Sequence, residues 1–372
     1  MPEELPPFSS RHLMSARRSQ PSSPQLGVAL AAALLACSLV STSCGGGAQG
    51  APVNEGGPEN VTLRIGYFPN VTHASAIVGV EKGLWAAHLD SNVDLQPTTF
   101  NDGTEAVEAL FSGAIDASFI GPNPAITGFA QSNGEALRIV SGATSGGAFL
   151  VVNPQIMAPA DLRGKKISSP SLGNTQDVAL RAWLAEQGLE TNPEGGGDVS
   201  IVPQENAQIL ETFAAGEIDG AWVPEPWATR MREEAGGTVL VDEADLWPEG
   251  QFVTTHIIVE KAFLEAHPDV VKGLLQGHVA ATDFVQDNPE EAQRIVNDAI
   301  EQVTGASLDT DTIAAAWENL EFTVDPIADS LRGAAEDAVS VGLLEPVELD
   351  GIYDLSLLNE VLADLGREEV QG

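Results

Sequence analysis

A short pattern occurs twice in the chain, and this internal repeat limits the possible folds more than any other feature. The segment Gly113-Ala-Ile-Asp-Ala-Ser-Phe-Ile-Gly-Pro-Asn-Pro124 resembles Gly216-Glu-Ile-Asp-Gly-Ala-Trp-Val-Pro-Glu-Pro226. Each copy runs from Gly-x-Ile-Asp into an apolar strand and then into a Pro-x-Pro loop, so Asp116 and Asp219 hold equivalent positions. Two copies are too few for a solenoid. They predict a pair of α/β lobes with equivalent loops at equivalent strand ends.

The surrounding sequence alternates short apolar runs with helical segments, which indicates parallel strands joined by helices. The first lobe is expected to hold strands at 63–67, 93–99 and 115–120 with helices at 74–82 and 103–112, and the second lobe a strand at 165–169 and a helix at 177–187. A strand at 252–259 and the helices after it return to the first lobe. The predicted fold class is therefore α/β, with two lobes, a mainly parallel sheet flanked by helices in each, and a cleft between them. Residues 61–150 and 251–372 are assigned to lobe 1, and residues 151–250 to lobe 2.

The N-terminal segment has the pattern of a secretion signal. Arg17 and Arg18 precede an apolar run from Leu26 to Val40 that is short for a membrane span. Small residues then lead to Cys44, which resembles the lipidated cysteine of a bacterial lipoprotein, and Cys37 is a rival match inside the apolar run. Residues 1–43 are accordingly predicted to be a lipoprotein signal peptide.

A Gly-rich segment follows that cysteine, and residues 44–60 are predicted to form a flexible tether between membrane and domain. Met14 offers a second possible start for a more compact signal. The expected location is extracytoplasmic, on the cell membrane through a lipid anchor.

The composition excludes several classes of function. Lys and Arg number 17 against 54 Asp and Glu, a net charge of −37, and nucleic acid is therefore not an expected partner because phosphate binding needs a basic surface. The only cysteines are Cys37 and Cys44, which leaves the body of the chain without a disulfide, a thiolate metal site or a cysteine nucleophile. The histidines lack metal-site spacing and no G-x-S-x-G occurs. No catalytic residue, metal or cofactor is predicted.

Small polar residues gather at the predicted strand-to-helix junctions of both lobes, and they are the main candidates for solute binding. Helix N-termini carry free N–H groups and a partial positive charge, so they can hold an anion without Lys or Arg. The alternative is that Thr72, Asn174 and Thr175 only cap their helices. The recurrence of such residues in both lobes favours binding. The candidates are Asn70, Thr72, His73, Gly121, Asn123, Thr144, Ser145, Asn174, Thr175 and Gln176.

A second candidate group is Trp222-Val-Pro-Glu-Pro-Trp227. Glu225 is held between two prolines and can pair with an ammonium group or a metal ion, while an indole such as that of Trp227 can pack on an organic solute. The alternative interpretation is that the tryptophans belong to the core and Glu225 is solvated.

Taken together, these motifs resemble the substrate-binding proteins of nitrate, sulfonate and taurine ABC importers, which share a fold with thiamine-precursor binding proteins. The resemblance spans about Val61 to Leu365 and rests on Gly66-Tyr-Phe-Pro-Asn-Val-Thr-His73, Glu81-Lys-Gly-Leu84, Ile120-Gly-Pro-Asn-Pro124, Leu172-Gly-Asn-Thr-Gln176 and Asp219-Gly-Ala-Trp-Val-Pro-Glu-Pro-Trp227. It implies a type II periplasmic-binding-protein fold that closes around a solute. It also implies an ABC permease and a cytoplasmic ATPase as partners, a monomer, and no catalysis. By motif position it places Asn70, His73, Asn123, Asn174, Thr175 and Glu225 on solute-contacting loops.

The resemblance and the neutral loops favour an aliphatic sulfonate or taurine as the solute. In this hypothesis the taurine amine meets Glu225 and its sulfonate meets Thr72 or Thr175. Nitrate, bicarbonate and thiamine precursors stay open, as does a sensor that presents its closed form to a receptor. A thiamine-pyrimidine synthase is the enzyme alternative, and it is disfavoured because that family needs a cysteine-rich segment.

Overall fold

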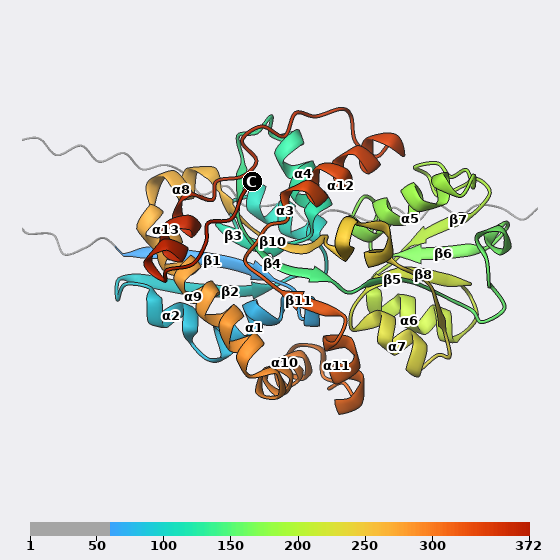
Figure 1. Cartoon of the computed structure of the whole chain (residues 1–372), viewed down its shortest axis with the longest axis horizontal. Helices are drawn as coiled ribbons and strands as arrows, with labels where there is room; N and C mark the ends of the chain where they lie inside the picture. Colours follow the sequence, from blue (N-terminus) through green and yellow to red (C-terminus); the bar gives the residue numbers. More distant parts are fainter. Residues whose placement is uncertain (1–59) are drawn as a thin grey trace, which may run out of the picture. The chain divides into compact units, whose positions relative to one another are not determined.

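A computed structural model describes residues 60–372 of the chain (Figure 1). The predicted signal peptide with Met14, the two cysteines, and all of the predicted tether except Asn60 lie outside the described residues. The described residues belong to one compact unit. Within it, the strands of residues 60–372 build two separate sheets.

The first sheet has six strands in the order β11-β4-β10-β3-β1-β2. Its strands are β1 (Val61–Tyr67), β2 (Val93–Thr99), β3 (Ala117–Ile120), β4 (Leu137–Gly146), β10 (Val253–Glu260) and β11 (Leu320–Phe322). Strand β1 runs parallel to β2 and β3, whereas β10 is antiparallel to β3 and β4, and β11 is antiparallel to β4.

The second sheet has five strands in the order β7-β6-β8-β5-β9. They are β5 (Ala148–Val152), β6 (Lys166–Ser169), β7 (Ser200–Pro203), β8 (Gly220–Pro224) and β9 (Thr238–Asp242). Strand β6 is parallel to β7 and β8, and β5 is antiparallel to β8 and β9.

The α/β class with two sheets is confirmed, but both sheets are mixed rather than mainly parallel. The antiparallel pairs of the two sheets all involve β5, β10 or the short edge strand β11. Strands β5 and β10 are the two at which the chain enters one sheet from the other.

The chain passes from the first sheet to the second at Gly147 and returns between β9 and β10. The predicted boundary between residues 150 and 151 thus falls inside β5, and the one between residues 250 and 251 falls in the returning segment. We call the first sheet with its helices lobe 1 and the second sheet with its helices lobe 2.

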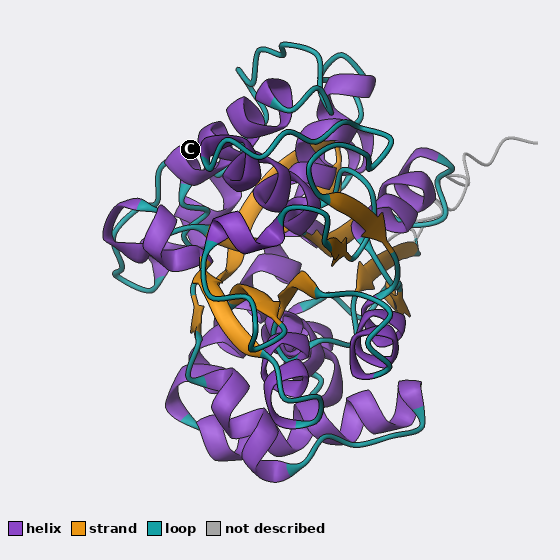
Figure 2. Ribbon diagram, turned by 90° about the vertical axis from the view of Figure 1, so that its right-hand side faces the viewer, coloured by secondary structure: helices purple, strands orange, loops and turns teal. Residues whose placement is uncertain are grey.

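Helices surround the strands of both sheets (Figure 2). Lobe 1 holds α1 (Ala74–Glu81), α2 (Leu84–His88), α3 (Gly103–Phe111), α4 (Pro122–Gln131), α8 (Lys261–Ala266), α9 (Pro268–Asp287), α10 (Pro289–Thr304), α11 (Thr310–Trp317), α12 (Ala328–Ser340) and α13 (Ser356–Asp364). Lobe 2 holds α5 (Thr175–Glu186), α6 (Asn206–Ala214) and α7 (Trp227–Glu233). The short 3₁₀ helices are η1 (Val71–His73), η2 (Pro159–Leu162), η3 (Glu243–Leu246) and η4 (Pro248–Gly250). Within residues 60–372, no helix combines the length and the apolar character that crossing a membrane requires.

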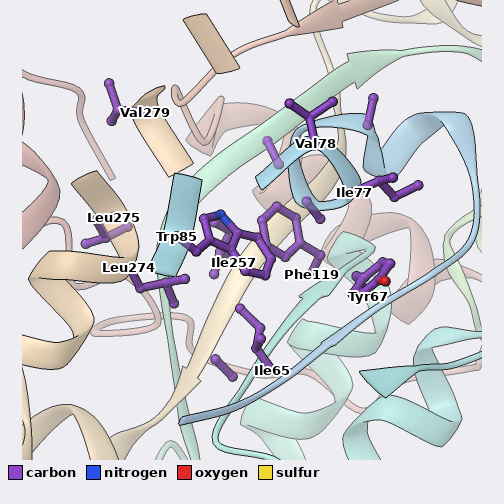
Figure 3. Packing of buried hydrophobic residues seen from close by; sticks show 14 of the residues in the cluster. Ile65, Tyr67, Ile77, Val78, Trp85, Phe119, Ile257, Leu274, Leu275 and Val279 are labelled. Atoms are coloured by element: carbon purple, nitrogen blue, oxygen red, sulfur yellow. The ribbon is translucent and has the colours of Figure 1, made fainter. Parts of the chain in front are cut away.

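The core of lobe 1 is centred on Trp85 and Phe119, whose rings stack with centroids 5.6 Å apart (Figure 3). Ile65 of β1, Ile257 of β10 and Leu274 of α9 pack around them and are fully buried. Burial of such large apolar side chains is the main favourable term in folding. It fixes β1, β3 and β10 in one rigid layer.

The two copies of the sequence repeat form the same unit in each lobe. Gly113 and Gly216 follow α3 and α6 with φ of +69° and +72°, a conformation that suits glycine, and each reverses the chain toward a strand. The next aspartate then accepts a backbone N–H from the neighbouring parallel strand. The Arg64 N–H donates to Asp116 at 2.8 Å, and the Lys166 N–H donates to Asp219 at 2.9 Å.

The loop before α5 is fixed by a buried carboxylate, Asp177. This side chain accepts hydrogen bonds from the Ser169 hydroxyl at 2.6 Å, the Gly173 N–H at 2.9 Å and the Arg181 Nε at 2.9 Å. Asp177 and Arg181 are almost fully buried. The pair therefore joins the end of β6 to the first turns of α5.

Replacing Asp177 with alanine should lower the free energy of unfolding by about 3–5 kcal/mol, because it leaves the Arg181 guanidinium buried without its counter-charge. Urea unfolding followed by circular dichroism measures this. Asp329 is the matched control, since it pairs with Arg332 while 98% exposed. Asp329→Ala should cost less than about 1 kcal/mol. Equal losses in the two variants would contradict the role given to Asp177.

Candidate solute-binding cavity

A cavity of about 440 Å³ lies between the lobes. Its wall is built from the segments that follow the carboxyl ends of the parallel strands β1, β2, β3, β6, β7 and β8. Ligands bind at this edge in open α/β sheets. A larger open hollow of about 930 Å³ lies between α12 and residues 346–356 of lobe 1, away from these strand ends and from every predicted site residue.

Eight of the predicted residues line the cavity between the lobes. They come from both lobes and are Asn70, Thr72, His73, Gly121, Asn174, Thr175, Gln176 and Trp227. The structure thus brings together segments far apart in the sequence, and contact with a solute stays a prediction.

On the lobe 1 side, Asn70 and Thr72 hold each other in place. The Asn70 Oδ1 accepts from the Val71 N–H at 3.1 Å, and its Nδ2 donates to the Thr72 Oγ1 at 3.0 Å. The Thr72 hydroxyl therefore acts as an acceptor within the protein, and its own proton is available to a solute. Thr72 does not cap α1, whose N-cap is His73 with no side-chain hydrogen bond. The capping interpretation of Thr72 does not hold in the structure.

His73 is a neutral donor in the cavity wall. Only 3% of the residue is exposed, and its Nδ1 accepts from the Phe68 N–H at 3.3 Å. That acceptor role places the remaining proton on Nε2. Burial lowers the pKa of His73 to about 3, so the ring carries no charge near neutral pH.

On the lobe 2 side, the cavity receives the start of α5. Asn174 caps this helix, because its Oδ1 accepts from the Asp177 N–H at 3.1 Å. Thr175 makes no such bond and lies against Gly121 of lobe 1. A Cβ added to Gly121 would be 2.5 Å from the Thr175 Oγ1, so a larger residue at position 121 would force the Thr175 side chain to shift. This is a direct contact between the lobes beside the cavity.

Three of the predicted residues in lobe 1 lie behind the cavity wall. Asn123 donates its Nδ2 to the Ala334 carbonyl at 3.0 Å, and the Thr144 hydroxyl donates to the Thr72 carbonyl at 2.6 Å. Ser145 is buried in β4, where it pairs with Val253. None of the three lines the cavity, and the Asn123 and Thr144 side chains bond to carbonyl groups of the protein.

Glu225 is also off the cavity, which corrects the proposed pairing with a solute ammonium group. It is fully buried and accepts from the Thr229 N–H at 3.1 Å, the Thr229 hydroxyl at 2.9 Å and the Asn319 Nδ2 at 2.7 Å. Asn319 belongs to lobe 1, so Glu225 links the lobes. Burial raises the pKa of Glu225 to about 7, partly offset by these hydrogen bonds.

Of the two tryptophans in this segment, one belongs to the core and the other lines the cavity. Trp222 belongs to the core, and its Nε1 donates to the buried Glu243 carboxylate at 2.7 Å. Trp227 lines the cavity together with Pro224 and Pro226.

Sequence reasoning missed several wall residues, of which Arg230 is the most informative. It is the single Lys or Arg in the cavity wall as the structure describes it, and its guanidinium lies 4.9 Å from the Trp227 ring centroid. The i, i+3 spacing from Trp227 could have revealed it, since such residues share a helix face. The other charged wall residues are Asp102, Glu205 and Glu211. Further members that the sequence did not single out are Phe68, Phe100, Thr254 and Thr255.

The cavity therefore presents both signs of charge. Asp102 caps α3, and its Oδ1 accepts from the N–H groups of Thr104 at 2.7 Å and Glu105 at 3.1 Å. Glu205 and Glu211 are exposed. Within residues 60–372, no cluster of three His, Asp or Glu side chains is arranged to hold a metal ion.

Comparison with known proteins identifies the family. Residues 56–299 match the NMT1-like family over most of the chain. The chain belongs to the NMT1-like family. A Brucella abortus protein named as a binding protein is 27% identical over 294 residues, which cover 77% of this chain and 88% of that protein. The taurine-binding periplasmic protein of Escherichia coli is 30% identical over 192 residues, 51% of this chain and 57% of that protein.

Solved structures share the fold. The alkanesulfonate-binding protein SsuA of Xanthomonas axonopodis pv. citri, bound to MOPS, superposes with a TM-score of 0.66 at 20% identity and covers 78% of this chain and 96% of its own. The nitrate-binding protein NrtA of Synechocystis PCC 6803 gives 0.66 at 18% identity, with 82% and 89% covered. The predicted periplasmic-binding-protein fold and the resemblance to nitrate, sulfonate and taurine binding proteins are confirmed. Fold and family are those of solute-binding proteins.

The close approach of Gly121 to Thr175 predicts a steric test of the contact between the lobes. Gly121→Ala should lower the melting temperature of the protein, because the Thr175 side chain has to move away from the added Cβ. The double variant Gly121→Ala with Thr175→Ala should recover most of this loss, because the added Cβ then loses the Oγ1 that it meets at 2.5 Å. If the double variant recovered none of the loss, the contact between Gly121 and Thr175 would not be its cause.

The burial of Glu225 predicts a pH dependence of stability. Its folded pKa, about 7, lies above its ordinary value of 4.5, so its stabilising contribution is full below pH 4.5 and is lost as the pH rises through 7. Glu225→Gln removes this loss, so the variant should gain on the natural protein by about 2–3 kcal/mol between pH 5 and pH 8. Urea unfolding at both pH values measures the gain, with exposed Glu290→Gln as a control. A gain that does not change with pH would show that Glu225 ionises normally.

Proposed function

We propose that this protein is the extracytoplasmic solute receptor of an ABC importer, and that it captures a small organic sulfonate, with taurine and aliphatic sulfonates foremost. The observation that carries the proposal is the cavity between the lobes, where neutral hydrogen-bond donors and helix starts from both lobes surround one space.

The sulfonate end of the solute is matched by donors that carry little formal charge. Thr175 and Gln176 at the start of α5 line the cavity, and a helix N-terminus attracts anions through free N–H groups and the helix dipole. The hydroxyls of Thr72 and Thr175 and the Nε2–H of His73 add neutral donors that fix orientation.

The amine of taurine needs an acceptor other than Glu225. Asp102, Glu205 and Glu211 line the cavity and supply carboxylates for this role. A zwitterion with its amine and its sulfonate in opposite charge environments can therefore be bound by these residues without Glu225.

The size and apolar lining of the cavity favour an organic solute over a small inorganic ion. A volume of about 440 Å³ lies within the range typical of organic-ligand pockets, about 300–1,000 Å³. Phe68, Phe100 and Trp227 provide aromatic surface for carbon atoms of the solute. Nitrate and bicarbonate would leave most of this space to water.

The importer role draws support from relatives, since the similar proteins include periplasmic taurine-, sulfonate- and nitrate-binding proteins. In this role the closed receptor meets an ABC permease and, through it, a cytoplasmic ATPase. Lipid attachment at Cys44 would keep a monomeric receptor at the membrane. The proposed role is binding without catalysis, and the lack of cysteine in residues 60–372 disfavours the thiamine-pyrimidine synthase alternative.

Thermal unfolding against a panel of solutes tests the proposal. The panel comprises taurine, methanesulfonate, longer alkanesulfonates, nitrate, bicarbonate and thiamine pyrimidines. A solute at about 100 times its dissociation constant adds roughly 2.7 kcal/mol to the free energy of unfolding. Taurine or an alkanesulfonate should raise the melting temperature most. Stabilisation by a thiamine pyrimidine or an inorganic ion alone would overturn the sulfonate assignment, and no shift with any of them would favour a sensor for another ligand.

A further inference from the structure

We propose that Arg230 selects the anionic group of the solute, and that the Glu234 carboxylate pairs with Arg230 until this anionic group displaces it. This inference rests on the proposed function, because it concerns the same cavity. It adds a residue that decides the charge class of the solute.

The guanidinium of Arg230 is already in the geometry that binds an anion. Its Nε donates to the Glu234 Oε1 at 2.6 Å and its Nη2 donates to the Oε2 at 3.2 Å. This two-point contact is the arrangement in which a guanidinium recognises the paired oxygens of a carboxylate, and a sulfonate offers a similar pair. No hydrogen bond of its Nη1 is present within residues 60–372.

Trp227 keeps this guanidinium at the cavity. The Arg230 Cζ lies 4.9 Å from the Trp227 ring centroid, and both side chains line the same wall. A cation over an indole face is attracted to the ring, which restricts the swing of the long side chain. The Arg230 guanidinium is therefore held against the Trp227 ring before any solute arrives.

The bond to Glu234 is easy to exchange. The Arg230 side chain is 24% exposed and that of Glu234 is 46% exposed, and they form an i, i+4 pair on one helix face. Such exposed pairs contribute little to stability. An anionic solute group that is enclosed between the lobes meets less competition from water, so it can displace the Glu234 carboxylate.

Arg230 is the single positive side chain of the described wall, beside the acidic Asp102, Glu205 and Glu211. Without it, every charged residue of that wall would be acidic. A cavity of that kind favours a cation. The Arg230→Gln variant should thus lose anions and gain cations, which a merely structural arginine would not do.

The test titrates the protein by calorimetry with methanesulfonate, taurine, acetate and, as a cationic probe, tetramethylammonium. Arg230→Gln should weaken the anions at least about tenfold and strengthen tetramethylammonium. Glu234→Gln should tighten the anions by about threefold or more, because it removes the competing carboxylate. Arg232→Gln is the matched control, since Arg232 is an exposed neighbour in α7 outside the cavity wall, and its affinities should not change.

The outcomes separate this inference from the proposed function. If acetate binds through Arg230 while sulfonates do not, the sulfonate assignment fails and the role of Arg230 stands. If a sulfonate binds equally well to the natural protein and to Arg230→Gln, the role of Arg230 is overturned and the proposed function survives. Failure of every anion to bind the natural protein would also overturn the role of Arg230. Weaker anion binding by Glu234→Gln would show that Glu234 supports Arg230 rather than competing with the solute.

Discussion

The positions of the strand ends depend on one interaction that each lobe repeats: an aspartate that binds the backbone of the neighbouring parallel strand. Asp116 ties β3 to β1, and Asp219 ties β8 to β6. Each follows a glycine in a left-handed conformation that ends the preceding helix. Because a strand slip would move every side chain to the other face of its sheet, this anchor also fixes which residues leave the strand ends toward the cavity. The candidate site lies at the strand ends that this repeated unit positions.

Charge is distributed differently on the surface and in the cavity wall. The net charge of −37 is carried largely by the surface, while the cavity wall combines hydroxyls, a neutral histidine and one arginine with the carboxylates of Asp102, Glu205 and Glu211. Two further carboxylates are buried where they bond within the protein. Glu225 joins lobe 2 to Asn319 of lobe 1, and burial raises the pKa of Glu243 to about 7 beside its donor Trp222. These groups stabilise the framework and leave binding to others.

The sequence predicted those features that depend on local patterns. The strand at 93–99 has the bounds that were expected, and the junctions around Asn70 and Asn174 line the cavity because each follows a parallel strand. The direction of Glu225 was not predictable, since a carboxylate in a Pro-x-Pro loop can point to either side and its burial depends on Asn319, far away in the chain. The mixed sheets were missed because apolar runs do not reveal strand direction. Arg230 was missed because an arginine in a helix is ordinarily a surface residue.

Closure of the lobes around a solute is tested most directly by measuring the distance between them with and without taurine. Spin labels at the exposed Glu108 of α3 and Gln208 of α6 would report this distance by double electron–electron resonance. Saturating taurine, with binding verified by calorimetry, should shorten the distance and narrow its distribution. An unchanged distribution in the presence of bound taurine would contradict capture between the lobes.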